Sequence, residues 1–352
     1  MTHRPGSHIF AKLPAVLLPW YQEHKRELPW RSTGDPYRIW LSEIMLQQTR
    51  VEAAKGYYKR FLEKLPTIDA LANADDALLH KLWEGLGYYS RVRNLKKAAQ
   101  EIVSRYNGVF PVQYDEIRSL PGIGPYTAGA ICSIAFNQKT PAVDGNVLRV
   151  AARLTDDHTV IDTPAFKKAI NVSLWSVYPE EAGDFTQALM ELGATVCKPN
   201  GAPECQICPC KDICLARARG TADRLPVRQA KRVRKVERYT VLIMQCQGLF
   251  ALQQRPANGL LAGLWEFPNM PGRLTVQQLA DELEEKGVSL KEIKAEVERK
   301  HIFTHVQWDM SGVYVEVAAP GGDFEWLTAE QINTQIALPT AFRMFWDAAE
   351  RV

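Results

Sequence analysis

The spacing of apolar residues changes once along the chain, and this change constrains the fold more than any other feature. Up to about residue 215 apolar side chains recur every three or four positions, as in 91–106 and 164–178, which is typical of amphipathic helices. Beyond residue 237 the pattern shifts. The stretch 238–255 predicts two strands joined at Gln247 and Gly248, and 306–318 predicts another strand rich in β-branched residues. The pattern therefore predicts an all-α domain followed by an α+β domain.

A chain of 352 residues is long enough for two such domains. In the second domain, 275–287 predicts an amphipathic helix and 340–352 a closing helix. We place the boundaries at 1–215 for the helical domain, 216–236 for a linker and 237–352 for the α+β domain. No apolar run is long enough to span a membrane and no signal peptide is recognisable, so we expect a cytoplasmic protein with no membrane partner.

The predicted linker concentrates positive charge. Residues 216–238 hold nine Lys or Arg against Asp223 and Glu237, whereas the whole chain carries a net charge of only +3. A solvated linker would have this composition. A basic strap that lies along a polyanion would have it too. The residues alone leave both interpretations open.

The sequence LPGIGPYTAGAI, residues 120–131, places two glycines at the entrance of a predicted helix. Gly122 and Gly124 can adopt positive φ and leave their backbone N–H groups unobstructed. Such N–H groups at a helix N-terminus favour an anion, so the turn is a candidate phosphate cradle. Pro125 suits a first helical turn because it needs no N–H partner there. A plain tight turn between two helices is the alternative.

Two carboxylates stand out from their surroundings. Glu43 lies in an apolar helical stretch, 40–46, where burial would raise its pKa and keep it protonated. Asp144 precedes Gly145 and a predicted helix, a position where it can cap the helix and be held ionised. One protonated and one ionised carboxylate is the pair that cleavage of a glycosidic bond requires. Taken singly, each also fits a structural role, as the rim of an amphipathic helix or as an N-cap.

Five cysteines fall between residues 197 and 214, at positions 197, 205, 208, 210 and 214. In a chain without secretory features such clustering favours a metal centre over disulfides. A set of four thiolates suits zinc and an iron–sulfur cluster equally well, so spacing alone does not choose between them.

These stretches together resemble the adenine DNA glycosylases of the MutY family, over nearly the whole chain. The resemblance is carried by LPWR (28–31), YRIWLSEIMLQQTRV (37–51), LWEGLGYYSRVRNL (82–95), LPGIGPYTAGAI, VDGNVLRV (143–150), LMELGATVC (189–197), the cysteines, GLLAGLWEFP (259–268) and HIFTHVQWDM (301–310). Members of this family remove adenine mispaired with 8-oxoguanine in base-excision repair. The resemblance implies a helix-hairpin-helix motif at about 113–135 and a [4Fe–4S] cluster in the loop 197–214. A monovalent cation at the hairpin is a further expectation.

The resemblance also assigns roles to matching residues. Glu43 would protonate adenine and later activate water. Asp144 would stabilise the oxocarbenium-like sugar or form a covalent intermediate, with Tyr126 and Asn146 in the same pocket. Residues assigned to hold the extruded adenine are Arg26, Trp30, Arg31 and Gln187. Residues assigned to bind the DNA are Gln48, Thr49, Tyr88, Gly122 and Gly124. Cys197, Cys205, Cys208 and Cys214 would bind the cluster, with Cys210 as a fallback ligand.

Tyr126 distinguishes this chain from the related endonuclease III family, where a lysine at the matching position forms a Schiff base. A tyrosine cannot do so, and the sequence therefore favours a monofunctional glycosylase over a pyrimidine glycosylase with lyase activity. A catalytically silent mismatch-binding protein is the alternative from another class. A silent protein of that kind would be expected to lack one of the two carboxylates, but both Glu43 and Asp144 are present.

The C-terminal region resembles the Nudix-like domain that recognises 8-oxoguanine in this family. Phe303, Thr304 and His305 fall where the family usually has Phe-Ser-His. The Nudix metal motif is degraded, with Ala280 and Asp281 in place of Arg-Glu, which argues against nucleotide hydrolysis. The chain also departs from the family in the cysteine loop, where seven residues rather than six separate Cys197 from Cys205. We expect a monomer, associated with the nucleoid, that acts on duplex DNA containing 8-oxoguanine·A or G·A.

Overall fold

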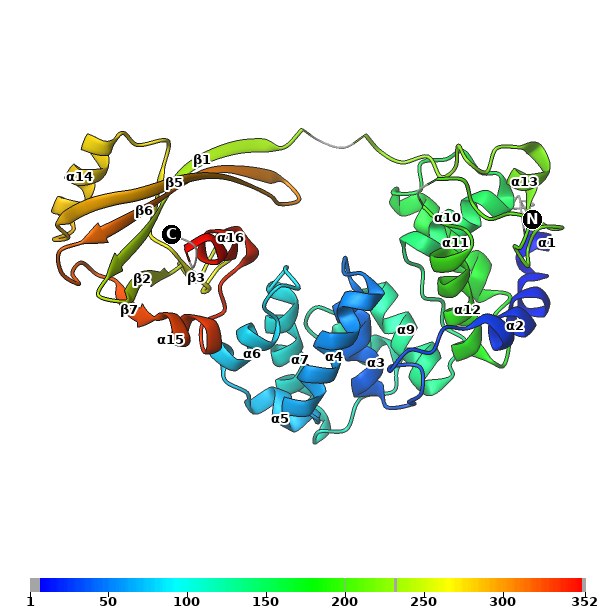
Figure 1. Cartoon of the computed structure of the whole chain (residues 1–352). Helices are drawn as coiled ribbons and strands as arrows, with labels where there is room; N and C mark the ends of the chain where they lie inside the picture. The colour runs from blue at the N-terminus through cyan, green and yellow to red at the C-terminus, as the bar shows by residue number, and fades with distance from the viewer. Residues whose placement is uncertain (1–6, 200, 231–232, 350–352) are drawn as a thin grey trace. The chain divides into compact units, whose positions relative to one another are not determined.

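A computed structural model describes residues 7–199, 201–230 and 233–349 (Figure 1). The chain divides into two compact units. Unit 1 comprises the residues up to Asn73 together with Asn94–Ala230, and unit 2 comprises Ala74–Arg93 together with the chain beyond Ala230. The division 1–215, 216–236 and 237–352 stays a prediction, because these units follow spatial contacts and bring residues 74–93 together with the C-terminal half.

The described part of unit 1 is helical, as the sequence predicts. Its helices are α1 (Ser7–Phe10), α2 (Leu13–His24), α3 (Pro36–Leu46), α4 (Val51–Lys64), α5 (Ile68–Asn73), α8 (Tyr114–Ser119), α9 (Pro125–Phe136), α10 (Gly145–Thr155), α11 (Pro164–Trp175), α12 (Ala182–Thr195) and α13 (Leu215–Arg219). Helix α7 (Ser90–Tyr106) begins in the residues of unit 2. The chain breaks between α3 and α4, because Gln47 is extended and Gln48 adopts a φ of 62°.

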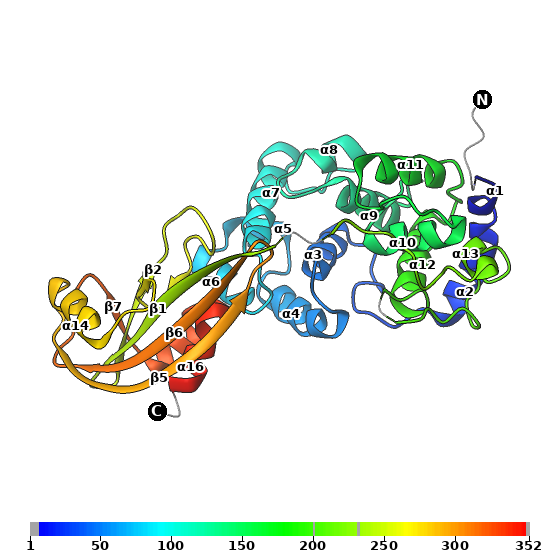
Figure 2. The ribbon, with the colours of Figure 1, turned by 90° about the horizontal axis from the view of Figure 1, so that it is seen from above.

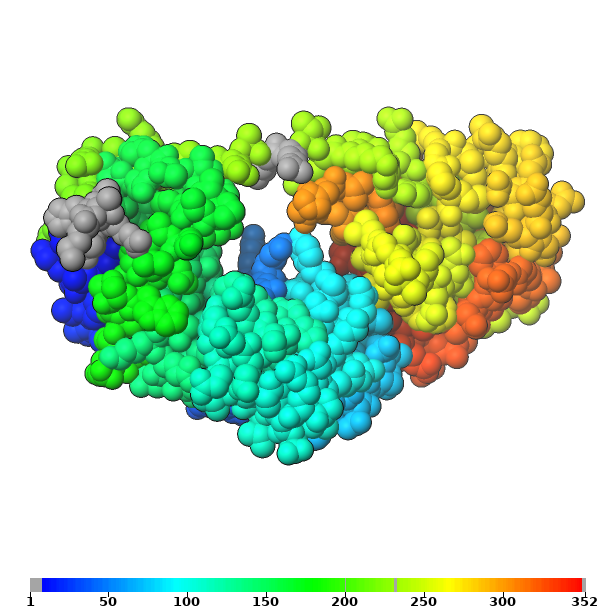
Figure 3. All heavy atoms as spheres, turned by 180° about the vertical axis from the view of Figure 1, so that it is seen from behind, coloured from blue at the N-terminus to red at the C-terminus, as the bar shows by residue number. Residues whose placement is uncertain are grey.

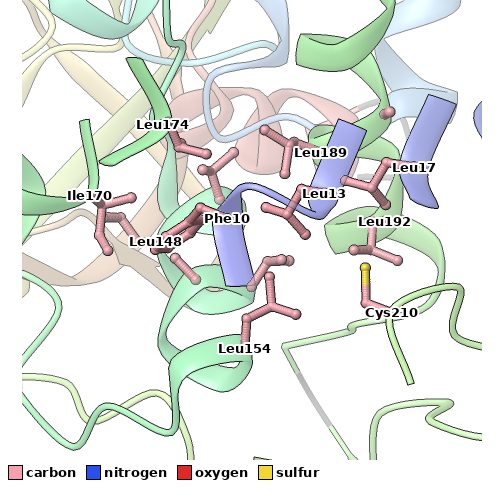
Figure 4. Close-up of a cluster of buried hydrophobic side chains, with 14 of the residues drawn as sticks. Phe10, Leu13, Leu17, Leu148, Leu154, Ile170, Leu174, Leu189, Leu192 and Cys210 are labelled. Carbon is pink, nitrogen blue, oxygen red and sulfur yellow. The ribbon is translucent and has the colours of Figure 1, made fainter. Parts of the chain in front are cut away.

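Helices α2, α10, α11 and α12 bury one apolar core. Leu13 and Leu17 of α2 meet Leu148 of α10 and Leu189 and Leu192 of α12, all nearly inaccessible to solvent (Figure 4). Burying an aliphatic side chain of this size contributes about 1.5–3 kcal/mol. This core holds α10 and α12 in place, and these two helices carry much of the site described below.

Unit 2 is built on a mixed sheet. Its strands are β1 (Lys235–Cys246), β2 (Leu249–Gln254), β3 (Trp265–Glu266), β4 (Asn269–Pro271), β5 (Leu290–Ile302), β6 (Val306–Val317) and β7 (Glu325–Thr328). The order is β3-β2-β1-β6-β5, with β4 also pairing with β1 and β7 with β2. Strands β1 and β6 are parallel, whereas β5 and β6 form an antiparallel hairpin (Figure 2).

Alternate side chains of β1 enter two separate apolar cores. Val241 and Ile243 pack with α16 (Thr340–Ala349), whereas Leu242 and Met244 pack with α14 (Val276–Glu285). This is the period of two expected for a strand buried on both faces. Helix α15 (Ala329–Thr334) and α6 (Asp76–Leu82) complete the unit. The strands predicted around Gln247 and Gly248 are confirmed, and both turn residues have positive φ, 49° and 81°.

Candidate active site

One cavity in unit 1, of about 640 Å³, gathers side chains from α3, α9, α10, α12 and the segment before α3. The residues predicted for catalysis and for adenine binding all line it, together with two of those predicted for DNA binding: Arg26, Trp30, Arg31, Glu43, Gln48, Thr49, Tyr126, Asp144, Asn146 and Gln187. Residues up to 161 positions apart in the sequence thus meet at one site. A cavity of this size is sufficient for a nucleobase-sized ligand.

Glu43 projects from α3 into this cavity and is only 5% exposed. Burial raises its pKa from 4.5 to about 7. The hydroxyl of Tyr126 donates a hydrogen bond to Glu43 Oε2 at 2.5 Å, which lowers the pKa and so opposes this effect. The nearby Asp144 raises it further. Glu43 is thus a carboxyl that can hold a proton near neutral pH and give it up readily, as a general acid and base must.

Asp144 caps the N-terminus of α10, as the sequence predicts. Its Oδ1 accepts from the backbone N–H of Val147 at 2.7 Å, and its Oδ2 accepts from Asn146 Nδ2 at 2.7 Å. Burial raises its pKa, while these two donors and the nearby Arg149 act against the rise. The carboxylate therefore faces the cavity with fixed donors behind it, an arrangement suited to holding negative charge.

Glu191, a fully buried carboxylate of α12, lines the same cavity and is not among the residues predicted from the sequence. It accepts from Arg26 Nε at 2.7 Å and from Arg31 Nη2 at 2.7 Å. Burial alone would raise the pKa of Glu191, but the two arginines lower it to about 2. Its position between Met190 and Leu192 was the available signal, since the same reasoning singles out Glu43 among apolar neighbours. Arg26 and Arg31, which are predicted to hold adenine, thus also form an ion pair with Glu191 that the sequence does not predict.

The apolar wall of the cavity is positioned by aromatic packing. Trp30 is 6% exposed and meets the ring of Tyr58 edge-on, with ring centroids 5.4 Å apart. Gln187, one turn before Glu191 on α12, donates from Nε2 to the carbonyl of Gly183 at 3.4 Å. A flat planar wall beside a set of polar groups is the surface expected for a stacked heterocyclic base.

The predicted hairpin consists of α8, a tight turn and α9. Gly122 takes a φ of 76°, and a Cβ on it would lie 2.7 Å from Asn94 Cβ. Gly124 differs from expectation because its φ is −90°, which any residue can adopt. It caps α9, and a Cβ on it would meet no atom within 4 Å among the described residues. The open backbone at this N-terminus leaves room for an anion.

Two of the residues predicted to contact DNA have strained backbones. Gln48 has a φ of 62° and Tyr88 a φ of 47°, values uncommon outside glycine. Gln48 lines the cavity of unit 1, whereas Tyr88 belongs to unit 2 and is 48% exposed. Strain of this kind concentrates at functional sites.

Tyr88 lies beside the predicted recognition residues of unit 2. Its hydroxyl and Thr304 Oγ1 are 2.7 Å apart and share a hydrogen bond. Both residues line a cavity of about 420 Å³ with Phe303 and His305, between the β5–β6 tip and the loop 259–261. In Figure 3 this tip (orange) lies beside that loop (yellow). Phe303 is fixed by edge-on contact with Trp308 at 4.8 Å. Thr304, where the family has serine, is thus within reach of a ligand in this cavity.

The four predicted cluster cysteines, Cys197, Cys205, Cys208 and Cys214, line one small cavity. Cys210 does not line it and is only 1% exposed, in the core of unit 1. No three His, Cys, Asp or Glu side chains of the described residues are gathered as a single metal ion would need. A tetrahedral zinc site draws four sulfurs to one ion, whereas in a four-iron cluster the thiolates bind different irons and lie farther apart. Four thiolates at one cavity can serve as donors to either group.

A chain of buried arginines connects the cysteines to Asp144. Arg149 donates to Asn146 Oδ1 at 2.9 Å and to the carbonyl of Cys197 at 2.8 Å. Arg153, one turn further along α10, donates to Cys197 Sγ at 3.2 Å. The cysteine loop and the Asp144 carboxylate are therefore held by the same helix.

Three of the nine basic residues of the segment 216–238 form ion pairs among the described residues. Arg219 pairs with Asp156 at 2.8 Å, Arg228 with Asp162 at 3.6 Å and Lys235 with Glu237 at 2.8 Å. Lys231 and Arg232 lie outside the described residues. Pairs this exposed contribute only about 0–1 kcal/mol, so these side chains remain available to phosphates, and both interpretations of the segment stay predictions.

Comparisons with known proteins first identify the class. Residues 41–174 match the family model described as HhH-GPD superfamily base excision DNA repair protein, and residues 239–348 match the NUDIX domain model. A solved thermostable thymine-DNA glycosylase aligns with a TM-score of 0.55 and 27% identity over 61% of this chain and 99% of that chain. An endonuclease III–DNA complex aligns with a TM-score of 0.51 and 23% identity over 60% of this chain and 97% of that chain, showing the same fold. The chain is a base-excision repair glycosylase with a Nudix-like domain.

Relatives then identify the family. The chain is 35% identical to the adenine DNA glycosylase of Mus musculus, over 97% of this chain and 80% of that protein. It is 33% identical to that of Homo sapiens, over 96% and 76%, and to that of Schizosaccharomyces pombe, over 90% and 85%. The chain belongs to the adenine DNA glycosylase family, and the predicted fold class and enzymatic activity are confirmed. None of the described helices combines the length and apolarity needed to cross a membrane.

Proposed function

We propose that the chain excises adenine paired with 8-oxoguanine or guanine by hydrolysis without strand cleavage. The observation that carries this is the pairing of Glu43, a buried carboxyl with a pKa of about 7, with Asp144 in one cavity. Protonated Glu43 gives its proton to the adenine N7, so that the base leaves as a neutral molecule. The ionised Glu43 then accepts a proton from the attacking water.

Asp144 stabilises the positive charge that develops on the sugar, directly or through a covalent adduct. Asn146 and the Val147 N–H keep the carboxylate oriented toward the cavity. Tyr126 holds the Glu43 carboxyl in place and supplies no amine for a Schiff base. Burial raises the pKa of its phenol well above 10, so this donor keeps its proton at any working pH.

The extruded adenine is proposed to stack on Trp30, with Arg26, Arg31 and Gln187 at its edge. Glu191 is proposed to fix the positions of both arginine side chains. Extrusion costs on the order of a few kcal/mol, which contacts to the base and the duplex must offset.

The DNA contacts are proposed to come from both units. Gln48 and Tyr88 are proposed to wedge into the duplex and fill the gap left by the extruded base, and Thr49 to bind the DNA. Gly122 and Gly124 cradle a phosphate at the N-terminus of α9. Phe303, Thr304 and His305 recognise 8-oxoguanine, with the Thr304 hydroxyl facing the altered edge of the base.

Cys197, Cys205, Cys208 and Cys214 are proposed to hold a [4Fe–4S] cluster. Their shared cavity supports this, as does the packing of Cys197, Cys208 and Cys214 against the core. Such a cluster ties the loop together and can exchange an electron. The monovalent cation at the hairpin and the monomeric state stay predictions. Action on chromosomal DNA would place the protein at the nucleoid.

A single-turnover assay on end-labelled duplexes tests the proposal. The duplexes carry 8-oxoguanine·A, G·A or thymine glycol·A, and each is worked up with and without alkali. We expect cleavage at adenine only after alkali, fastest opposite 8-oxoguanine, and none with D144N. Breaks without alkali, or cleavage at thymine glycol, would instead indicate a lyase of the endonuclease III kind. Tight binding without base loss would indicate a silent mismatch-binding protein.

A further inference from the structure

Residues 83–89, between α6 and α7, form the loop that carries Tyr88, and we call them the Tyr88 loop. The backbone bends sharply here, since Gly85 and Gly87 have φ values of 93° and 67°. Two side chains hold the bend together. Trp83 Nε1 donates to the carbonyl of Gly87 at 3.1 Å, and Arg91 Nη2 donates to the same carbonyl at 3.0 Å. The shape of the loop is therefore fixed from within.

Glu84, at the start of the Tyr88 loop, attaches this loop to the C-terminal part of unit 2. Its Oε1 accepts from the backbone N–H of Leu338, 254 positions away, at 3.1 Å and lies 3.2 Å from Arg343 Nη2. Its Oε2 lies 2.7 Å from Lys81 Nζ, which also donates to the carbonyl of Ile336 at 2.8 Å. The Glu84 side chain is only 15% exposed. Charge-assisted bonds shielded in this way are stronger than those of exposed pairs.

The segment that Glu84 contacts is also a wall of the proposed recognition cavity. Residues 339–341 directly follow Leu338 and line the cavity of about 420 Å³, together with Tyr88 and Thr304. The Leu338 N–H that Glu84 accepts thus lies at the edge of this wall. One carboxylate therefore holds the Tyr88 loop against the cavity into which Tyr88 faces.

Helix α16 extends the same connection to the hairpin tip. Phe342 precedes Arg343 on α16, and its ring centroid lies 6.1 Å from that of Trp308. Trp308 in turn meets Phe303 edge-on. The arginine that pairs with Glu84 is therefore next in sequence to a residue that packs behind the tip.

We propose that Glu84 is a positioning residue for lesion recognition: its carboxylate locks the Tyr88 loop to Leu338 and α16, and so fixes Tyr88 relative to the recognition cavity. The inference rests on the proposed function, in which this cavity receives 8-oxoguanine and Tyr88 enters the duplex. A site of this kind depends on supporting contacts, because small displacements of the groups that touch the ligand are costly.

The position of Glu84 predicts an effect on discrimination. Glu84 lines neither the cavity of unit 1 nor the recognition cavity, so it acts through the residues that it holds. The 8-oxoguanine·A and G·A duplexes offer the same adenine to the active site and differ only in the opposite base. Loosening the Tyr88 loop should therefore slow excision opposite 8-oxoguanine more than excision opposite guanine.

The test compares the full-length wild type with E84Q, R343Q, the double variant and a control. E84Q keeps the size of the side chain and an acceptor for the Leu338 N–H, but it removes the charge. The control is E316Q. Glu316 of β6 also pairs with two cations, Lys291 at 2.5 Å and Lys294 at 2.7 Å, within the β5–β6 hairpin, and its side chain is 27% exposed.

Two properties are measured on each protein, after thermal unfolding has shown that it is folded. The first is the ratio of single-turnover rates on 8-oxoguanine·A and G·A duplexes at saturating enzyme. We expect this ratio to fall about 2- to 10-fold in E84Q and R343Q, because residues in contact couple by such amounts. The double variant should fall no further than E84Q, since both changes break one contact, and E316Q should keep the wild-type ratio.

The second property is hydrogen exchange of the DNA-free protein, followed by mass spectrometry. Peptides that cover 83–89 and 336–341 should exchange faster in E84Q and R343Q than in the wild type or E316Q, because the contact that holds the two segments together is lost. Unchanged exchange in both peptides of E84Q would overturn the inference.

The inference is also overturned if folded E84Q keeps the wild-type ratio, or if it loses rate equally on both duplexes, as a merely structural role would cause. If E84Q does not fold, R343Q carries the same test, because it leaves Glu84 with Lys81 and Leu338. A wild type that shows no preference for 8-oxoguanine would instead contradict the proposed function, and this is visible before any variant is measured. The two failures are therefore distinguishable.

Discussion

The hydroxyl of Tyr126 donates to Glu43 Oε2 at 2.5 Å, and this contact joins the hairpin helix α9 to α3, the helix that carries Glu43. The hairpin that is proposed to hold a DNA phosphate thus also holds the proposed proton donor. The bond moderates the effect of burial, because it lowers a pKa that burial raises to about 7. Position and acidity of Glu43 are therefore set together.

The rate of base loss should depend on the protonation of Glu43. With a pKa of about 7, the single-turnover rate should be flat below neutral pH and fall about tenfold per pH unit above it. E43Q, which cannot donate this proton as an acid, should lose about 10²–10⁴-fold in rate. The measurement is a pH–rate profile on 8-oxoguanine·A duplex.

Y126F is the matched variant for this profile. It removes the bond that lowers the pKa of Glu43, so the alkaline limb should move to higher pH. An unmoved limb in Y126F would show that the titrating group is not Glu43.

Ionisation of the buried Glu43 should lower the free energy of unfolding at alkaline pH. Its pKa is raised in the folded state, so its stabilising effect is complete below pH 4.5 and is lost as the pH rises through about 7. The difference between the unfolded pKa of 4.5 and the folded pKa of about 7 corresponds to about 3 kcal/mol in the free energy of unfolding. E43Q should therefore unfold at higher denaturant than wild type at pH 8, with the gap closing at pH 5. Equal midpoints at both pH values would contradict the burial of an ionisable group.

Glu191 should be a strong stability determinant. Removing it leaves Arg26 and Arg31 without their shared carboxylate, and breaking a buried ion pair costs about 3–5 kcal/mol. Since the side chain of Arg26 is 37% exposed, we expect the lower end for E191Q. The control is E63A, which removes an exposed pair with Lys59 and should cost under about 1 kcal/mol. Urea unfolding of both variants measures the contrast.

Tyr88 should set the preference for 8-oxoguanine through Thr304. Y88F keeps an aromatic ring but loses the 2.7 Å contact between the two hydroxyls. A neutral hydrogen bond contributes about 0.5–1.5 kcal/mol, so the ratio of rates on 8-oxoguanine·A and G·A should fall about 2- to 10-fold. T304S should keep the ratio and T304A should lose it. An unchanged ratio in both Y88F and T304A would remove this hairpin tip from lesion recognition.

The sequence predicted those parts of the site whose signal is local. Glu43 is recognisable from its apolar neighbours, Asp144 from the helix that it caps, and the turn at Gln247 and Gly248 from its strands. Glu191 also has apolar neighbours, but the two arginines that keep it ionised lie 160 and 165 positions away, and the sequence does not show that they meet it. The burial of Cys210 likewise depends on α2 and α12, which lie far from it in the chain.

Strand β5 was missed for a different reason. Its residues 290–302 are rich in Lys and Glu, which favour helix on composition. The strand lies at the edge of the sheet, where one face is exposed and charges are tolerated. Ala295 and Val297 both pack against the core on the α16 side, two positions apart. The alternation of apolar and polar residues expected of a strand is therefore present in the sequence, but it is weak.

The two glycines of the hairpin should separate folding from DNA binding. At Gly122 the φ of 76° and the approach of Asn94 forbid a side chain, so G122A should lose about 1–3 kcal/mol of stability. At Gly124 the φ of −90° suits alanine and a Cβ would meet open space, so G124A should unfold like wild type. If that space receives a phosphate, G124A should still bind duplex several-fold more weakly, with a shallower salt dependence. Thermal unfolding measures the stability of each variant, and fluorescence anisotropy measures its affinity for duplex DNA. Full affinity in G124A would place the phosphate elsewhere, and the hairpin would then be a structural turn.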